Sequence, residues 1–146
     1  MKVISHRGNL IGSVPELENS PGYIEKALEA GFDVEIDVWM ERGAWKLGHD
    51  YPEHDTTMEF ISQKGLFLHA KNLEALVALL STDLHYFWHD VDHYTLTSKN
   101  FIWTFPQMKT TRRSIIVCQD EHQTNTYKNM PIAGICTDYA FLGEDK

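Results

Sequence analysis

The chain has 146 residues, of which 42% are hydrophobic and 23% are charged, a composition that excludes a disordered tail or a fibre. This length is typical of one domain, and we expect a single domain over residues 1–146. Thirteen Lys and Arg against twenty-one Asp and Glu give a formal charge of −8, which argues against nucleic-acid binding because that function requires a basic surface.

Short apolar segments rich in β-branched and aromatic residues recur along the chain, and eight of them have the length of a strand. They are Val3–Ser5, Val34–Trp39, Trp45–Gly48, Leu66–Ala70, His85–Trp88, Phe101–Phe105, Ile115–Cys118 and Ala133–Thr137. No linker, low-complexity stretch or block of charge divides them.

The interval after the first of these segments carries the signals of a helix. Ser20 is a good N-cap, Pro21 suits the first helical position, and Gly31 suits the exit. Apolar residues between these signals recur at helical spacing, so we predict a helix between Ser20 and Gly31.

A second helix is predicted after the fourth strand, where Asn72 is placed to cap it. Its apolar residues, which we expect to face inward, are Leu73, Leu76, Val77 and Leu80. A shorter helix is predicted from Thr56 or Thr57 to Gln63. The later intervals 90–99 and 120–131 are polar, and we expect them to hold only a turn or two.

Strands that alternate with helical intervals predict parallel βα units. A (β/α)₈ barrel typically takes about 250 residues, whereas 146 residues shared among eight units leave about 18 for each. We therefore predict an α/β fold, a reduced TIM-type barrel with several short or missing helices, whose bare strand faces are exposed or covered by a partner subunit. An open doubly wound sheet is the alternative, although its Gly-rich turn after the first strand is missing.

Three further features bear on compartment and partners. No apolar run approaches the roughly 18 residues of a membrane helix, so we expect no membrane insertion. The chain enters a strand-like segment at its start, which predicts no signal peptide and a cytoplasmic location. Cys118 and Cys136 each lie in an apolar stretch, and we prefer two free thiols to one disulfide.

The second predicted strand carries two carboxylates, Glu35 and Asp37, on one face, because side chains alternate along a strand. Its other face is apolar and suits helix packing. Two inward carboxylates near the end of a strand suit a hard divalent cation, which can reverse the local field for a small anionic substrate. A solvent-facing edge of an antiparallel strand is the alternative interpretation of the same pattern.

Four histidines, His6, His49, His69 and His89, fall at or near the carboxyl end of a predicted strand. In a barrel those ends converge on one face, where the active site is built. The remaining histidines lack such placement, and we interpret them as surface or packing residues: His54, His85, His93 and His122.

Two basic residues accompany these histidines. Lys71 shares a strand face with His69, and because an unpaired buried charge is costly we expect it to pair with the carboxylates or with an anionic substrate. Arg7, beside His6, is a second candidate contact for an anion through its fork of donors.

Five motifs occur in order along the chain: Ser5-His6-Arg7-Gly8, Glu18-Asn19-Ser20, Gly31-Phe32-Asp33-Val34-Glu35-Ile36-Asp37-Val38, Gly48-His49-Asp50 and Gly134-Ile135-Cys136-Thr137-Asp138-Tyr139. Together they resemble the glycerophosphodiester phosphodiesterases, a family grouped with phosphatidylinositol-specific phospholipase C and spider-venom sphingomyelinase D. The match is close over the first fifty residues and good at the last strand, and it is weak in the middle of the chain.

The resemblance implies a TIM-type barrel and a metal-dependent phosphodiesterase of lipid metabolism that acts on a small phosphodiester substrate. It implies a divalent metal, Mg²⁺ or Ca²⁺, on Glu35 and Asp37, with His6 and His49 as general base and general acid. A neighbouring hydroxyl of the substrate would attack phosphorus and give a cyclic phosphate. The substrate-binding residues would be Arg7, Glu18, Lys71 and Trp103.

The chain departs from the family pattern in three places. The segment His69-Ala70-Lys71 stands where the family has Glu-x-Lys, so His69 becomes the third candidate metal ligand. An imidazole is softer than a carboxylate and shifts the preference towards Mn²⁺ or Zn²⁺. Trp103 resembles a substrate-wall residue of the family, with core packing as the alternative. The loops and helices that shape the substrate pocket of longer relatives are largely missing.

Two other functions stay open. The first is a non-catalytic barrel that binds a phosphorylated sugar or lipid headgroup, and the second is another reaction class on the same scaffold. Self-association into a homo-oligomer is a further hypothesis, motivated by the shortage of covering helices.

Overall fold

Ten strands and five helices form within residues 1–144, the part of the chain that the computed structural model describes. The strands are β1 (Lys2–His6), β2 (Asp33–Glu41), β3 (Ala44–Leu47), β4 (His54–Asp55), β5 (Leu66–Ala70), β6 (Tyr86–Trp88), β7 (Tyr94–Leu96), β8 (Ile102–Thr104), β9 (Ser114–Cys118) and β10 (Gly134–Thr137). The helices are α1 (Pro21–Glu29), α2 (Met58–Ile61), α3 (Leu73–Leu79), α4 (Glu121–Tyr127) and α5 (Ala140–Gly143). All eight predicted segments form strands.

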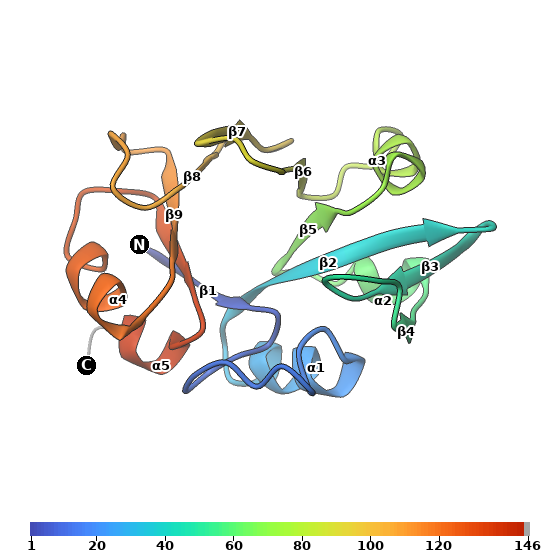
Figure 1. The fold of residues 1–146 in the computed structure, drawn as a ribbon, viewed down its shortest axis with the longest axis horizontal. Helices are drawn as coiled ribbons and strands as arrows, with labels where there is room; N and C mark the ends of the chain where they lie inside the picture. Colours follow the sequence, from blue (N-terminus) through green and yellow to red (C-terminus); the bar gives the residue numbers. More distant parts are fainter. Residues whose placement is uncertain (145–146) are drawn as a thin grey trace.

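The strands pair into one sheet that curls round on itself (Figure 1). Seven of them are parallel neighbours, in the spatial order β6, β5, β2, β1, β10, β9 and β8. Helices α1, α3, α4 and α5 lie outside the curl (Figure 1). The chain is therefore mixed α/β, as the alternation of strand and helix signals predicts.

A closed barrel of eight parallel βα units is not shown. The strand beyond β8 is β7, which runs antiparallel to it. The edges β6 and β7 approach each other, since Ser98 N donates to Tyr86 O at 2.9 Å and Thr95 Oγ1 donates to Trp88 O at 2.7 Å. No strand ladder joins these two edges within residues 1–144. The observed fold is a curled sheet with few helices, because so few residues are available for each unit.

The predicted strand Trp45–Gly48 is not a parallel strand of the curl. It forms β3, which returns antiparallel along the far half of β2, and β4 then pairs antiparallel with β3. Arg42 and Gly43 make the tight turn between β2 and β3, with φ of 50° and 79°. Positive φ at both turn residues matches the twist of a two-residue hairpin. Because arginine is an unusual residue for such a turn, the sequence did not reveal the hairpin.

The polar interval 90–99 holds a strand, β7, where we expected a turn or two. This strand has only three residues and is half-exposed, so it lacks the apolar run that identifies a buried strand.

The two faces of β2 differ as predicted. Val34, Ile36 and Val38 pack with α1 and α3 in an apolar cluster outside the sheet. Glu35 and Asp37 belong to the opposite face, inside the curl. A second apolar cluster joins β1, β5, β6, β8, β9 and β10: Ile4, Phe67, Phe87, Trp103, Ile115 and Cys136. Apolar side chains therefore fill much of the inside of the curl, and the inward polar side chains, such as Glu35 and Asp37, lie beside them.

The first helix lies where the sequence predicts it. Pro21 is the first residue of α1, and Gly31 follows its end with φ of 94°. Ser20 occupies the N-cap position, but its hydroxyl donates to Leu17 O and makes no capping hydrogen bond. Within residues 1–144, none of the helices has the length and the apolar character needed to cross a bilayer.

The inward face of α3 differs from the prediction. Asn72 caps the helix as expected, but its side chain also bonds to the backbone of Met40 in β2 and so fixes the helix against the sheet. In this orientation Ala75 and Leu79 are buried, and Leu76 is partly buried. Three residues predicted to face inward are instead 57–65% exposed: Leu73, Val77 and Leu80.

Both cysteines are free and buried, as the sequence predicts. Burial raises the pKa of Cys118 to about 12 and also raises that of Cys136. A thiol must ionise to act as a nucleophile, so we expect neither cysteine to be reactive.

His85 packs between the rings of Phe67 and Phe101, with centroids 4.1 Å and 5.7 Å away, and its Nε2 lies 2.8 Å from Thr97 Oγ1. Burial, together with two nearby lysines, lowers the pKa of His85 to about 4. An unfolded chain therefore binds more protons at this residue than the folded chain between pH 4 and about 6.5.

We expect the free energy of unfolding to rise with pH across this window, by about 1–2 kcal/mol from His85 after allowance for its partial exposure. Urea unfolding of the wild type and of His85→Phe at pH 4, 5, 6 and 7 measures this contribution. The variant should lose that part of the slope, and an unchanged slope would contradict the assignment.

Candidate functional site

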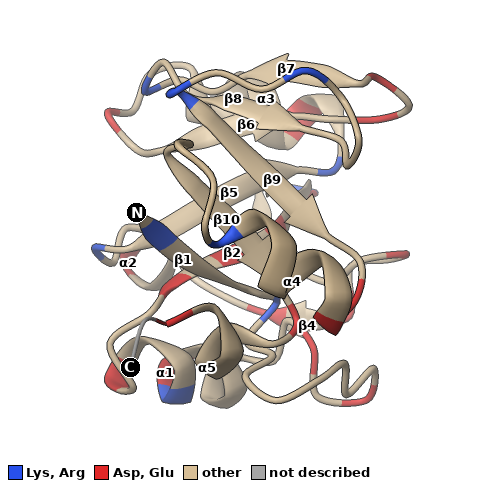
Figure 2. Cartoon of the chain, turned by 90° about the vertical axis from the view of Figure 1, so that its left-hand side faces the viewer, with Lys and Arg blue, Asp and Glu red and all other residues tan. Residues whose placement is uncertain are grey.

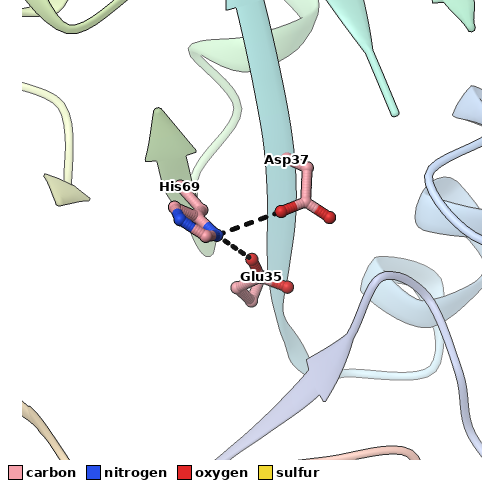
Figure 3. Close-up of side chains that lie close together, drawn as sticks. All are labelled: Glu35, Asp37 and His69. Carbon is pink, nitrogen blue, oxygen red and sulfur yellow. Dashed lines mark ion pairs between the residues drawn. The ribbon is translucent and has the colours of Figure 1, made fainter. Parts of the chain in front are cut away.

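Parallel pairing brings the carboxyl ends of β1 and β5 to the middle of β2, because β2 extends further than predicted, to Glu41. His6 of β1 lies opposite Glu35, and Asp37 lies opposite His69 of β5. Side chains two residues apart share a strand face, so both carboxylates approach the His69 ring, as Figure 3 shows. Glu35, Asp37 and His69 are all buried.

The donor atoms of these three residues are close enough to share one cation. His69 Nδ1 lies 3.0 Å from Asp37 Oδ1 and 3.6 Å from Glu35 Oε1. Neighbouring ligands of a six-coordinate ion of the size of Mg²⁺ stand about 3 Å apart. Glu35 Oε2 and Asp37 Oδ1 are buried without a hydrogen-bond partner, which is costly unless a positive charge meets them. The cluster therefore fits a divalent cation.

The other nitrogen of His69 supports the same conclusion. Nε2 lies 3.0 Å from the carbonyl oxygen of His89. A carbonyl only accepts, so we assign the ring proton to Nε2, which leaves the lone pair of Nδ1 directed at the carboxylates. Histidines that bind metals usually donate their second N–H in this way.

Asp37 lies among cationic groups. Arg7 Nε is 3.0 Å from Oδ2, and Lys71 Nζ is 3.9 Å from Oδ1. Burial opposes ionisation of Asp37, but its contacts with His69 and Arg7 outweigh burial and hold its pKa well below the usual range. Burial also disfavours protonated His69, yet Asp37 and Glu35 raise its pKa to about 9. The ionised carboxylates thus attract positive charge, a proton or a metal, to Nδ1.

His6 is held by a carboxylate at the end of the last strand. Its Nδ1 lies 2.8 Å from Asp138 Oδ1, and its Nε2 lies 3.8 Å from Glu35 Oε2. Asn9, which is buried, donates to the same oxygen of Asp138 at 2.8 Å. Burial disfavours protonated His6, but Asp138 and Glu35 raise its pKa above the ordinary value. Nε2 is therefore the nitrogen free to exchange a proton in the site.

His49 reaches the site by a different route from the one predicted. It follows the hairpin strand β3, which returns towards the middle of β2, where Gly48 N donates to Asp37 O at 3.2 Å. Gly48 has φ of 153°, and a Cβ there would lie 2.0 Å from Tyr51 O, so only glycine fits. The His49 side chain is partly exposed, and its Nδ1 lies 2.8 Å from Asp50 Oδ1.

These residues surround a cleft of about 540 Å³, within the size range of small-molecule sites. Seven predicted site residues line it: His6, Arg7, Glu35, His49, His69, Lys71 and Trp103. Asp37 is fully buried beside them. Trp103 stacks on Phe87, with ring centroids 4.5 Å apart, so it is both a core residue and part of the cleft wall.

Glu18 lines an adjoining cleft instead. Its carboxylate accepts hydrogen bonds from Arg7 Nη1 at 3.1 Å, Asn9 Nδ2 at 2.8 Å and Ser13 Oγ at 2.6 Å. These contacts position Arg7 and Asn9, whereas contact of Glu18 with a substrate stays a prediction.

Sequence reasoning did not identify Asp138 or Asp90 as site residues, yet both line the cleft, as does His89, which the sequence places at the end of a predicted strand. Asp138 follows the end of β10, and His89 and Asp90 follow the end of β6. The rule that parallel strands end at one face is the signal that could have found them.

Asn19 is the other residue that was missed. It is buried, its Nδ2 donates to Asp37 Oδ2 at 2.8 Å, and its Oδ1 accepts from Asp37 N at 2.9 Å. Its φ of 61° is one that asparagine adopts more readily than most residues. Asn19 therefore fixes the direction of one of the two carboxylates of the candidate metal cluster.

We expect Asn19→Ala to lower the free energy of unfolding by about 2–4 kcal/mol, because two hydrogen bonds to Asp37 are lost and its buried N–H is left unpaired. Asn19→Gly removes the same bonds but tolerates positive φ, so it should be less destabilising by about 1 kcal/mol. Urea unfolding of both variants measures this, and a loss below about 0.5 kcal/mol for Asn19→Ala would contradict the assigned role.

Compared with known proteins, the chain matches no protein-family model and no curated protein. The side chains around the cleft are therefore the basis for a functional proposal.

Proposed function

We propose that the chain is a metal-dependent phosphodiesterase acting in this cleft. The observation that carries the proposal is that a buried cluster of candidate metal ligands, an oriented imidazole and two basic side chains meet in one place. Glu35, Asp37 and His69 would hold the cation. When bound, the cation would neutralise phosphate oxygens and stabilise the charge that develops in the transition state.

The charges around the cleft support a requirement for a cation. Four carboxylates and two permanent cations line this cleft or are buried against it: Glu35, Asp37, Asp90, Asp138, Arg7 and Lys71. A cation bound to His69 would displace the proton that its raised pKa otherwise favours, and with neutral histidines the four negative and two positive charges sum to −2. A divalent cation balances this charge, and Arg7 and Lys71 can then contact phosphate oxygens.

The proton transfers follow from the hydrogen bonds of the two histidines. His6 Nε2 would accept the proton of a substrate hydroxyl, because Nδ1 is engaged by Asp138. That hydroxyl attacks phosphorus as the bond to the leaving oxygen breaks, which gives a cyclic phosphate. His49, which also lines the cleft, would donate a proton to the leaving alkoxide. Water then opens the cyclic phosphate with the two proton-transfer roles reversed.

This mechanism selects a substrate with a hydroxyl next to the phosphoester, such as a small glycerophosphodiester, with Trp103 as a wall of its pocket. We also propose that the chain is a short relative of the glycerophosphodiester phosphodiesterases, which its sequence motifs resemble. On this proposal the curled sheet is a reduced TIM-type barrel in which the antiparallel strand β7 stands where a parallel strand would be.

The test is hydrolysis of a glycerol phosphodiester and of its analogue with the neighbouring hydroxyl methylated, followed by ³¹P NMR. Each substrate is incubated with Mg²⁺, Ca²⁺, Mn²⁺ or Zn²⁺ and with EDTA. We expect metal-dependent turnover of the first substrate, with a cyclic phosphate intermediate, and no turnover of the second. Absence of turnover with every metal, or equal turnover in EDTA, would overturn the proposal.

A second candidate is a non-catalytic domain that binds a phosphorylated headgroup. The observation that favours it is the position of His49, which is 43% exposed and held by Asp50 rather than by the buried cluster. In that case the glycerol phosphodiester would bind in the presence of metal, as measured by calorimetry, without being cleaved.

A further inference from the structure

Within residues 1–144, one side of the curled sheet has no helix outside it. Helices α1, α4 and α5 cover the β1, β2, β9 and β10 region, whereas β6 and β7 carry no helix beyond α3 at their flank (Figure 1). Trp88 of β6 is 41% exposed and Leu96 of β7 is 67% exposed. A groove of about 390 Å³ runs between them, and Leu76 of α3, Tyr86 and Phe87 add to its apolar lining.

The neighbouring helix has an apolar stripe without a partner. Leu73, Val77 and Leu80 are 65%, 57% and 63% exposed. Spacings of four and three residues place them along one side of α3. An uncovered groove between β6 and β7 thus lies next to an exposed apolar stripe on α3. A helix with such a stripe could cover such a groove.

We propose that this face, made by α3, β6 and β7, is the interface of a two-fold symmetric homodimer in which the α3 stripe of one copy lies in the β6–β7 groove of the other. A two-fold interface requires one surface to be complementary to itself. A helix stripe beside a groove meets this requirement, because each copy offers both halves of the contact. The partner helix then occupies the place where a complete barrel would carry a helix of its own.

The size of the face suits a second copy. Five large apolar side chains of this face are each exposed by about half: Leu73, Val77, Leu80, Trp88 and Leu96. Together they present on the order of 300–600 Å² of apolar surface, which equals the largest apolar patches found on monomeric proteins. A standard dimer interface buries about 800 Å² on each partner, of which somewhat more than half is apolar. The patch therefore supplies about the apolar area that a stable dimer needs.

The charges at its edge also favour a second copy. Asp83, in the loop after α3, and Lys99, just after β7, form an ion pair. An acid and a base at one edge can exchange partners with the same pair in a copy related by two-fold symmetry. Lys99 is the one Lys or Arg between residues 72 and 99, so the face lacks the basic residues that bind an anionic membrane.

Sedimentation equilibrium of the full chain at 10–100 µM tests the proposal. The wild type should sediment at twice the 16.9 kDa mass of one chain. Val77→Glu, on the helix stripe, and Leu96→Glu, in the groove, should each raise the dimer dissociation constant by on the order of 10²-fold, because a charge is buried in the apolar contact. Far-UV circular dichroism confirms that each variant is folded.

The matched control is Ile11→Glu, which changes a 79% exposed apolar residue in the loop after β1. It should leave the dimer intact. A monomeric wild type at 100 µM would overturn the proposal, whether the face then binds another protein, a membrane or nothing. If both folded variants dimerise as tightly as the wild type, the dimer uses another surface. The same conclusion follows if Ile11→Glu is as monomeric as Val77→Glu and Leu96→Glu.

The interface is independent of the proposed function. The groove and the candidate active-site cleft share no lining residue. A dimer could therefore be found without phosphodiesterase activity, and the activity without a dimer.

Discussion

Replacing His6 with alanine is expected to lower kcat for phosphodiester cleavage by about 10²–10⁴-fold, the usual contribution of a general base. The reason is that His6 Nε2 is the ring nitrogen left free when Nδ1 is bound by Asp138, and it faces the cluster that would hold the metal. Metal affinity should change little, because the three proposed ligands remain. Steady-state kinetics at saturating metal, together with a metal titration, measures the two effects separately.

The matched control is His89→Ala. His89 also lines the cleft, but its hydrogen bond with His69 is made by the backbone carbonyl, which the substitution keeps. We expect its kcat to stay within tenfold of the wild type. Equal losses in the two variants would mean that any change in the cleft impairs turnover, and His6 would then have no special role.

The second large effect concerns His69, the proposed third metal ligand. Replacing His69 with glutamate should shift metal preference from Mn²⁺ and Zn²⁺ towards Mg²⁺ and Ca²⁺, by on the order of tenfold in relative affinity, because harder oxygen ligands favour harder ions. Three carboxylates would also repel one another, so the variant without metal should unfold at a lower temperature than the wild type. Isothermal titration with each metal and thermal unfolding in EDTA measure these two effects.

His69→Gln is the control for this experiment. It retains a polar side chain but supplies neither an imidazole nor a charge, so we expect it to lose Mn²⁺ and Zn²⁺ affinity without gaining affinity for Mg²⁺ or Ca²⁺. If His69→Glu and His69→Gln have the same metal preference as the wild type, then residue 69 is not a ligand.

The positions of the strands were predictable from sequence because buried strands need continuous apolar segments. The alternation along β2 correctly placed Glu35 and Asp37 on the inner face and the valines on the outer face. Strand pairing was harder to predict. The hairpin of β2 and β3 depends on positive φ at Arg42 and Gly43, and β7 is too short and too exposed to give an apolar pattern.

The rotation of α3 also could not be read from its apolar residues. The helix has more large apolar residues than one face can bury, and the contact of Asn72 with β2 decides which of them face the sheet. Four of the site histidines were found correctly near the cleft, because strand ends concentrate polar residues on one face. Asn19 was missed because its contact with Asp37 joins a loop to a strand, and local sequence does not encode that approach.

The central claim is that Glu35 and Asp37 hold a divalent cation, and thermal unfolding tests it most directly. The wild type and the Glu35→Gln/Asp37→Asn double variant are unfolded in EDTA and then with Mg²⁺, Ca²⁺, Mn²⁺ or Zn²⁺. A metal at about one hundred times its Kd should add about 2.7 kcal/mol to the wild type, which is a shift of roughly 5–11 °C for a chain of this size. We expect this shift with at least one metal and expect none in the double variant. No shift in the wild type with any metal, or the same shift in both proteins, would contradict the claim.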